Sequence, residues 1–119
     1  MPENREYMTR PEELGTIQIS EEVVASIASA AVLEVTDVTG LMGAQVSAFM
    51  GGKKMTAKGV RVEMDGDAIV VHVFITVRYG CTIGEVAKKA QSAVYQALES
   101  TTGYPVSAVN IHVGGISFN

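Results

Sequence analysis

Alternating apolar and polar residues predict a β-hairpin in the middle of the chain. Residues 60–64 and 67–79 both alternate, so that each stretch places its apolar side chains on one face of a strand. Asp65-Gly66 lies between them, and this dipeptide favours a two-residue hairpin turn. A turn at 65–66 pairs position 62 with 69 and position 60 with 71, which keeps the apolar faces of the two strands together.

Two further stretches have the spacing of amphipathic helices. The first follows Ser20, a residue that caps helix N-termini well, and carries an apolar stripe over residues 24–35. The second starts with a capping box formed by Thr82 and Glu85. Its end is predicted at Gly103, because glycine readily adopts the left-handed conformation of a helix C-terminus.

Short alternating stretches predict a strand near each end of the chain. They cover residues 15–20 and 106–113, and Gly114-Gly115 indicates a bulge after the second. The order strand, helix, two strands, helix, strand predicts an α+β two-layer sandwich, with two helices on one face of a mainly antiparallel four-stranded sheet. A ferredoxin-like arrangement is the first interpretation. A KH-like arrangement is the second, because the short first strand has room to sit elsewhere.

The chain of 119 residues has the size of one domain. Residues 1–14 are polar, contain two prolines and are expected to form a flexible N-terminal tail, so the single domain spans 15–119. Residues 40–58 lack a clear period and are expected to form a flexible loop within it. A phosphate-binding loop is not predicted there, because Ser47 and Lys54 stand where that motif requires glycine and a hydroxyl residue.

The composition of the chain argues against some classes of function and indicates a cellular compartment. Hydrophobic residues make up 47% of the chain, and its net charge of -4 argues against a dedicated nucleic-acid binder. Cys81 is the single cysteine, which fits a reducing compartment. No signal segment is evident, and the longest apolar-rich run, 23–33, is shorter than the ~20 residues that span a bilayer. These features predict a cytoplasmic protein without direct membrane insertion, which associates with membranes only through a partner.

The charge is unevenly distributed along the chain. Residues 1–37 hold eight acidic side chains and two arginines, whereas residues 38–119 hold seven basic and five acidic side chains. Four basic residues fall within nine positions, from Lys53 to Arg61. They indicate either a solvated loop or a docking patch for an acidic partner or an anionic surface.

The face of the sheet opposite the helices is predicted to carry apolar and basic residues together, which favours self-association unless residues 40–58 cover it. His72 and His112 would lie there on neighbouring strands, but a metal site needs a third ligand, and Cys81 lies in a loop. No catalytic residues, cofactor or metal are therefore predicted. The candidate interaction residues are Phe49, Met50, Lys53, Lys54, Met55, Lys58, Arg61, Val70, His72, Phe74, Arg78 and His112.

Four short motifs, taken in order, carry a resemblance to a known family. They are G-x-I-x-I at 15–19, E-V-x-x-V at 34–38, K-G-V-x-V at 58–62 and V-N-I-H-V-x-G-I-x-F at 109–118. Over residues 15–119 the chain resembles the alkaline shock protein family of Gram-positive bacteria, also called the general stress or envelope stress response family. The resemblance implies a cytoplasmic, non-enzymatic protein. Some members are recruited to the membrane by an anchor protein, and others resemble regulators linked to fatty-acid synthesis.

Two functional hypotheses follow. The first is an interaction protein that forms a homo-oligomer and docks on a partner protein, either a membrane anchor or a lipid-synthesis enzyme. The alternative is a small KH-like RNA-binding module, suggested by the basic run and by Arg78. KH domains bind RNA with a G-x-x-G loop between helices. The match here, Gly40 to Gly43, follows the first helix and lacks a basic residue, so binding to nucleic acid is not expected.

Overall fold

One long strand, β5 (Ala68–Arg78), pairs with every other strand of the main sheet. The computed structural model describes residues 7–12, 14–42 and 59–118. Within them the elements are β1 (Tyr7–Glu12), β2 (Gly15–Ser20), α1 (Glu21–Leu33), β3 (Val38–Leu41), β4 (Val60–Asp65), β5, α3 (Ile83–Thr102) and β6 (Val106–Ser117). β3 and β4 pair antiparallel with β5, and β6 pairs parallel with it.

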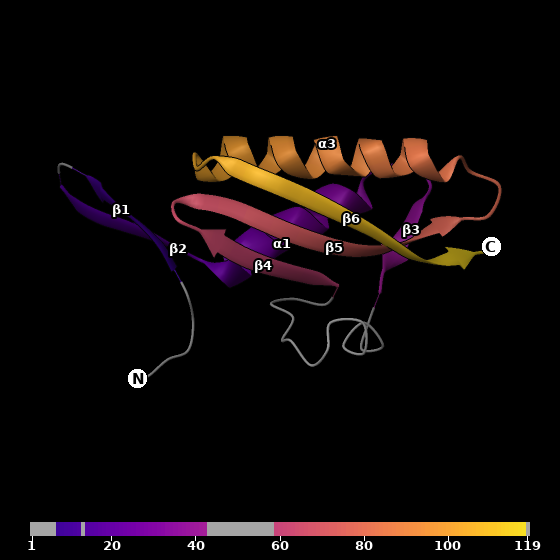
Figure 1. Ribbon diagram of the computed structural model, residues 1–119, viewed down its shortest axis with the longest axis horizontal. Helices are drawn as coiled ribbons and strands as arrows, with labels where there is room; N and C mark the ends of the chain where they lie inside the picture. Colours follow the sequence, from indigo (N-terminus) through magenta and orange to yellow (C-terminus); the bar gives the residue numbers. More distant parts are fainter. Residues whose placement is uncertain (1–6, 13, 43–58, 119) are drawn as a thin grey trace.

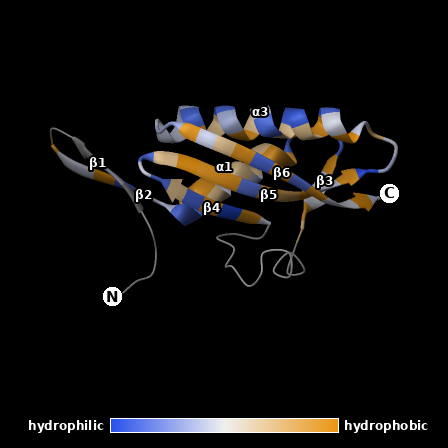
Figure 2. Cartoon of the chain, viewed as in Figure 1, coloured by the Kyte–Doolittle hydropathy of each residue, from blue (hydrophilic) through white to orange (hydrophobic). Residues whose placement is uncertain are grey.

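The parallel pairing of β5 and β6 explains the position of α3. Two parallel strands cannot be joined by a tight turn, and α3 is the crossover between them. α1 and α3 lie on the same face of the sheet (Figure 1). The hydrophilic residues of α3 lie on its side away from the sheet (Figure 2). The predicted α+β class, with two helices on one face of a mainly antiparallel four-stranded sheet, is confirmed.

The core lies between the helices and the odd-numbered residues of β5. Ile69, Val71, Val73, Ile75 and Val77 are all completely buried. They pack with Val24, Ala25, Ala28 and Val32 of α1 and with Val86, Ala90, Val94 and Leu98 of α3. Burying apolar surface at roughly 25 cal/mol per Å² stabilises this layer, and the small alanines let α1 approach the sheet closely.

The strand predicted at 15–20 forms, but it is not part of the main sheet. β2 pairs antiparallel with β1, and the hairpin they make extends away from the helices and the sheet (Figure 1). β1 lies within the segment expected to be a tail. The remaining edge position in the sheet is taken by β3, whose Val38 and Leu41 reach the core. The segment after α1, not the one before it, therefore completes the four strands.

The predicted hairpin is correct in its faces but wrong by two residues in its register. Asp65 pairs with Ala68, so the loop residues are Gly66 and Asp67, and position 62 pairs with 71 instead of 69. Gly66 has a φ of 65°, which suits it to the first loop position. A shift of two residues leaves each side chain on the predicted face. The bulge predicted at Gly114-Gly115 is confirmed, since the register of β5 and β6 shifts between Val113 and Gly115.

The helix ends follow the sequence closely, with one exception. The Ser20 hydroxyl accepts a hydrogen bond of 3.2 Å from the Val23 N–H, as a capping residue should. Gly103 ends α3 with a φ of 75°, and its N–H donates to the Glu99 carbonyl. Thr82 occupies the N-cap of α3, but its side chain forms no capping hydrogen bond, so the predicted capping box is not made.

β3 and β4 lie one after the other along the same edge of β5, and they meet opposite Phe74. The Met42 N–H donates to the Phe74 carbonyl at 2.9 Å, and the Phe74 N–H donates to the Gly59 carbonyl at 2.8 Å. Gly59 has a φ of 78°. A Cβ at this position would lie 2.8 Å from the Leu41 Cβ and 2.9 Å from the Met42 carbonyl oxygen. Both the backbone conformation and the close approach require glycine.

Replacing Gly59 with alanine should therefore destabilise the fold by about 2 kcal/mol, because strain in φ adds to the clash with Leu41. Urea unfolding measures this change. Gly84→Ala is the matched control, since Gly84 lies in α3 and a Cβ there meets nothing within 4 Å. That variant should be as stable as the wild type or more stable, by up to about 1 kcal/mol. Equal effects of the two substitutions would contradict the role of Gly59.

Candidate functional site

The face of the sheet turned away from the helices, here called the open face, carries five of the six candidate interaction residues that lie in the described part of the chain. It is built by alternate residues of three neighbouring strands. They are Arg61 and Glu63 of β4, Val70, His72, Phe74 and Thr76 of β5, and Asn110 and His112 of β6. Apart from the buried Phe74 and the exposed His112, these residues are half-buried.

Three titratable side chains form a continuous hydrogen-bonded row across the open face. Glu63 Oε2 lies 3.3 Å from His72 Nε2, and His72 Nδ1 lies 3.4 Å from His112 Nε2. With both imidazoles neutral, a single assignment makes both bonds. His72 donates its Nε2–H to the Glu63 carboxylate and accepts at Nδ1 from the Nε2–H of His112. Each strand contributes one member, so the row depends on the register of the sheet.

Arg61 completes the row at its acidic end. Its guanidinium forms an ion pair with Glu63, two residues along the same strand face. This hydrogen bond, together with the positive charge of Arg61, lowers the pKa of Glu63 below its ordinary value of 4.5, against an opposing effect of desolvation. Glu63 is thus held as a carboxylate that serves both Arg61 and His72.

An aromatic stack lies at the other end of the row, where His112 contacts Phe74. The rings of Phe74 and His112 are nearly parallel, with centroids 4.4 Å apart. Phe74 is only 4% exposed although it lies outside the main core, and Met42, also buried, bonds to its backbone. Partial burial is the main cause that lowers the pKa of His112, and the nearby charge of His72 lowers it further. The open face is therefore a small second apolar centre with a polar margin.

The structure brings four of the predicted interaction residues together, namely Arg61, His72, Phe74 and His112. Val70 lies beside them, paired with Glu63 across the strands. Arg78 lies at the end of β5, where its Nε bonds to Asp37 Oδ1 at 3.2 Å. The other predicted residues lie outside the described part of the chain; these are Phe49, Met50, Lys53, Lys54, Met55 and Lys58.

Sequence reasoning missed two members of the site. The alternation of residues 60–64 shows that Glu63 points away from the apolar face of its strand, but not that it lies next to His72. Met42 was placed in a segment without any period. The hairpin pattern does place Glu63 on the same strand face as Arg61, but the contact with His72 depends on the observed register, which pairs Arg61 with His72.

The arrangement has few of the parts that catalysis needs. A hydrogen-bonded carboxylate and imidazole supply two of the three parts of a nucleophile-activating system. The third part is a serine or cysteine within reach of the imidazole. Cys81 packs against the core on the helix side, whereas both histidines lie on the opposite face. Over residues 7–12, 14–42 and 59–118, no three histidine, cysteine or acidic side chains cluster in a way that suits a metal ion.

Comparison with known families identifies the family of this chain. Residues 9–118 match the alkaline shock protein 23 family, which is described as having a cell envelope-related function. The chain belongs to this family. The match confirms the resemblance that the four motifs indicated.

Two relatives within the alkaline shock protein family come from Bacillus subtilis (strain 168). The uncharacterized protein YqhY is 33% identical over 108 residues, which cover 89% of this chain and 80% of YqhY. The uncharacterized protein YloU is 33% identical over 108 residues, covering 86% of this chain and 88% of YloU. Among solved structures, the copper form of MamM CTD matches with a TM-score of 0.57 and 16% identity, over 82% of this chain and 97% of that one. At this identity the likeness concerns the fold alone.

The match to the alkaline shock protein family supports a role related to the cell envelope. In the described part of the chain, neither helix has the length and apolar character needed to cross a bilayer.

The row of titratable side chains makes stability sensitive to mild acid. Because the pKa of His112 is lowered in the folded chain, the unfolded chain binds protons more readily as the pH falls below the ordinary histidine value of 6.5. The free energy of unfolding should therefore decline from that pH down to the folded-state pKa of His112. Urea unfolding at a series of pH values between about 8 and about 5 measures the decline.

The substitution His112→Gln should flatten this decline, whatever it does to stability at neutral pH. Asn110→Gln, on the same strand and the same face, is the control and should keep the wild-type dependence on pH. If the wild type and His112→Gln lose stability equally between these pH values, His112 is not the group responsible.

Proposed function

We propose that this member of the alkaline shock protein family is a non-enzymatic interaction protein of the cell-envelope stress response. In this proposal the chain acts in the cytoplasm, associates with itself and docks on a partner protein through the open face. The partner brings it to the membrane if it is a membrane anchor, or links it to lipid synthesis if it is an enzyme of that pathway. The match to a family with a cell envelope-related function supports the cellular setting.

The observation that carries the docking proposal is the stack of Phe74 and His112 beside the Arg61–Glu63 ion pair. Aromatic side chains and arginine are enriched at the centres of protein interfaces, where they supply apolar contact and directed hydrogen bonds. An open sheet face also suits contact with another protein better than enclosure of a small substrate, because small-molecule sites are concave. Half-buried polar side chains around the stack provide the margin that such interfaces have.

The absence of a nucleophile beside the histidines, among the described residues, supports a non-enzymatic role. Thr76 is the nearest hydroxyl residue on β5 that shares the open face, and its Oγ1 is engaged with Thr39 Oγ1 at 2.9 Å. Glu63 is held by Arg61 and is therefore poorly suited to take up a proton near neutral pH. The side chains of the open face are thus organised to bond to one another.

The KH-like alternative receives less support. The KH-like alternative allowed the first predicted strand to lie outside the main sheet, and β2 does lie outside it. Its RNA-binding loop, however, would need the G-x-x-G motif at 40–43 to lie between two helices. Gly40 and Leu41 are instead part of β3 and pair with Thr76 and Ile75 in the sheet. An RNA backbone would find neither a helix N-terminus nor a basic side chain at these two residues.

A charged residue on the open face should release the chain from its partner. Val70→Glu places a carboxylate next to Glu63, where docking would bury it without a counter-ion. In cells that naturally produce the chain, the wild type should sediment with the membrane fraction through its partner, and Val70→Glu should remain in the supernatant. Quantitative immunoblotting of both fractions measures this.

The matched control is Val23→Glu, which introduces the same charge at a residue of α1 that is 48% exposed. It should sediment like the wild type, and thermal unfolding should show that both variants are folded. A wild type found entirely in the supernatant, under stress as well as in normal growth, would contradict the envelope role. Equal behaviour of the two variants would contradict docking through the open face.

A further inference from the structure

The outer edge of β6 is long and bears no charge. The strand runs over twelve residues, Val106–Ser117, and contains no lysine, arginine, aspartate, glutamate or proline. Within the described residues, β6 pairs with β5 on one side and with no strand on the other. Natural proteins usually protect such edges with charges, prolines or a covering element, because free backbone groups invite another strand. Gln91 of α3 bonds to one carbonyl of this edge, but within the described residues no strand pairs with it, so an uncharged edge of this length indicates a site for strand addition.

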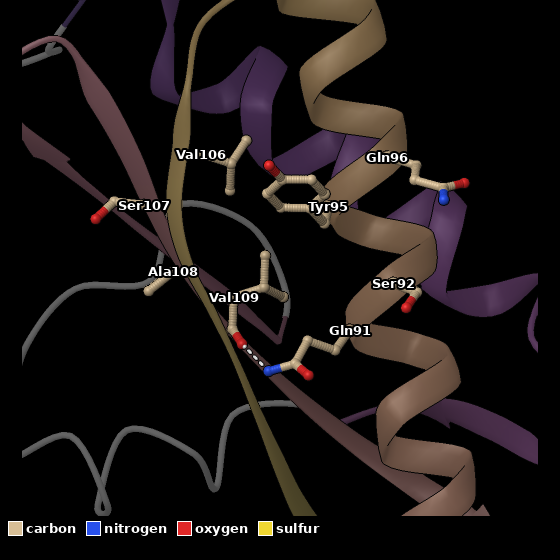
Figure 3. A pocket seen from close by; sticks show the side chains of 8 residues that line it. All are labelled: Gln91, Ser92, Tyr95, Gln96, Val106, Ser107, Ala108 and Val109. Carbon is tan, nitrogen blue, oxygen red and sulfur yellow. Dashed lines mark hydrogen bonds between the residues drawn. The ribbon is translucent and has the colours of Figure 1, made fainter.

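A groove between β6 and α3 adjoins one end of this edge (Figure 3). It has a volume of about 470 Å³ and is lined by residues 106–109 and by one side of α3, including Tyr95. Gln91 Nε2 donates to the Val109 carbonyl at 2.9 Å, which shows that the backbone groups of Val109 point to the free edge. Since alternate residues of a strand face the same edge, those of Ile111 and Val113 point the same way.

The other end of β6 carries exposed apolar side chains. Ile116 is 46% exposed, and Phe118 is 75% exposed although its ring stacks on that of Tyr79 with centroids 4.8 Å apart. Ile116 is in register with Val77, which faces the helices, so Ile116 also lies on the helix side of the sheet. Val106, at the groove end of the same strand, is in register with Ile69 and lies on that side too.

We propose that β6 pairs antiparallel with β6 of a second copy of this chain, with a two-fold axis at Ile111. This pairing places Ile111 opposite Ile111, and Val109 opposite Val113. The strand has one register irregularity on each side of the axis, near Ser107 and near Gly114. Their effects on the pairing cancel, so Val106 lies opposite Ile116 of the second copy. The exposed Ile116 of each copy is thereby seated at the groove between α3 and β6 of the other. The inference rests on the self-association included in the proposed function.

The occupant is a second copy because one strand carries both halves of the contact. A two-fold axis across an antiparallel pair brings the apolar end of one strand to the groove end of the other, and does so twice. The axis lies perpendicular to the sheet, so helix-side residues meet helix-side residues. A strand without charge also meets its own copy without repulsion between like charges directly opposite each other. The open face remains free on both copies.

Light scattering over a concentration series tests this proposal on the full chain. The wild type should dimerise, and Ile116→Lys should raise the dissociation constant at least about tenfold, because two lysines enter the two grooves. Leu33→Lys is the matched control, since Leu33 is 49% exposed and lies on α1. It should dimerise like the wild type. Circular dichroism confirms that both variants are folded.

A cross-link gives a second, independent measurement. In a Cys81→Ser background, Ile111→Cys places a thiol opposite its own copy, within the Cα separation that a disulfide spans. Mild oxidation should yield a covalent dimer on a non-reducing gel, whereas Leu33→Cys should not. A dimer that is equally strong in Ile116→Lys and Leu33→Lys overturns pairing through β6 but leaves self-association intact. A wild type that is monomeric at every concentration overturns both.

Discussion

The pairing of three strands with β5 is the constraint on which the rest of the structure depends. Its odd-numbered residues are completely buried under the two helices, and its even-numbered residues lie on the open face. One strand therefore supplies both the centre of the core and the centre of the candidate site. The requirement that Val71 and Val73 stay buried fixes His72 and Phe74 on the opposite side, because side chains alternate along a strand. The site is in this sense a consequence of the core.

The same constraint explains why the open face has its own small apolar centre. A single-sided sheet would expose Phe74 to solvent, but the ring of His112 stacks on it, the buried Met42 bonds to its backbone, and only 4% of its surface stays exposed. Met42 reaches this position because β3 ends and β4 begins opposite Phe74, a junction that Gly59 permits. A close contact that only glycine tolerates at the sheet edge thus supports the aromatic stack in the middle of the open face.

Much of this fold follows from local sequence patterns, and the exceptions have physical reasons. The faces of β4 and β5 were predictable, because Val60, Val62 and the odd residues of β5 must be buried together. The exact register was not, since turns at 65–66 and at 66–67 satisfy the same alternation. Asp65 lacks the positive φ that the first loop position requires and pairs with Ala68, whereas Gly66 has a positive φ and takes that position. The placement of β2 was not predictable either. Its sequence resembles a sheet strand, but Val38 and Leu41 fill the edge position from the other side of α1.

The candidate site also has a part that the sequence pattern predicts and a part that it does not. Alternation alone placed His72 and His112 on one face, whereas the bond between Glu63 and His72 depends on a register that alternation leaves open by two residues.

The geometry also separates the two kinds of contact proposed above, docking of a partner and pairing of copies. The open face points away from the helices, whereas the free edge of β6 lies in the plane of the sheet and its groove opens toward α3 (Figure 3). A strand added to that edge extends the sheet without covering Phe74 or His72. Pairing of copies would then align two open faces on the same side of one continuous sheet, because the two-fold axis is perpendicular to it. Two weak docking sites presented together bind a partner on a membrane, or any repeated partner, more tightly than either does alone, because the second contact forms at a high effective concentration.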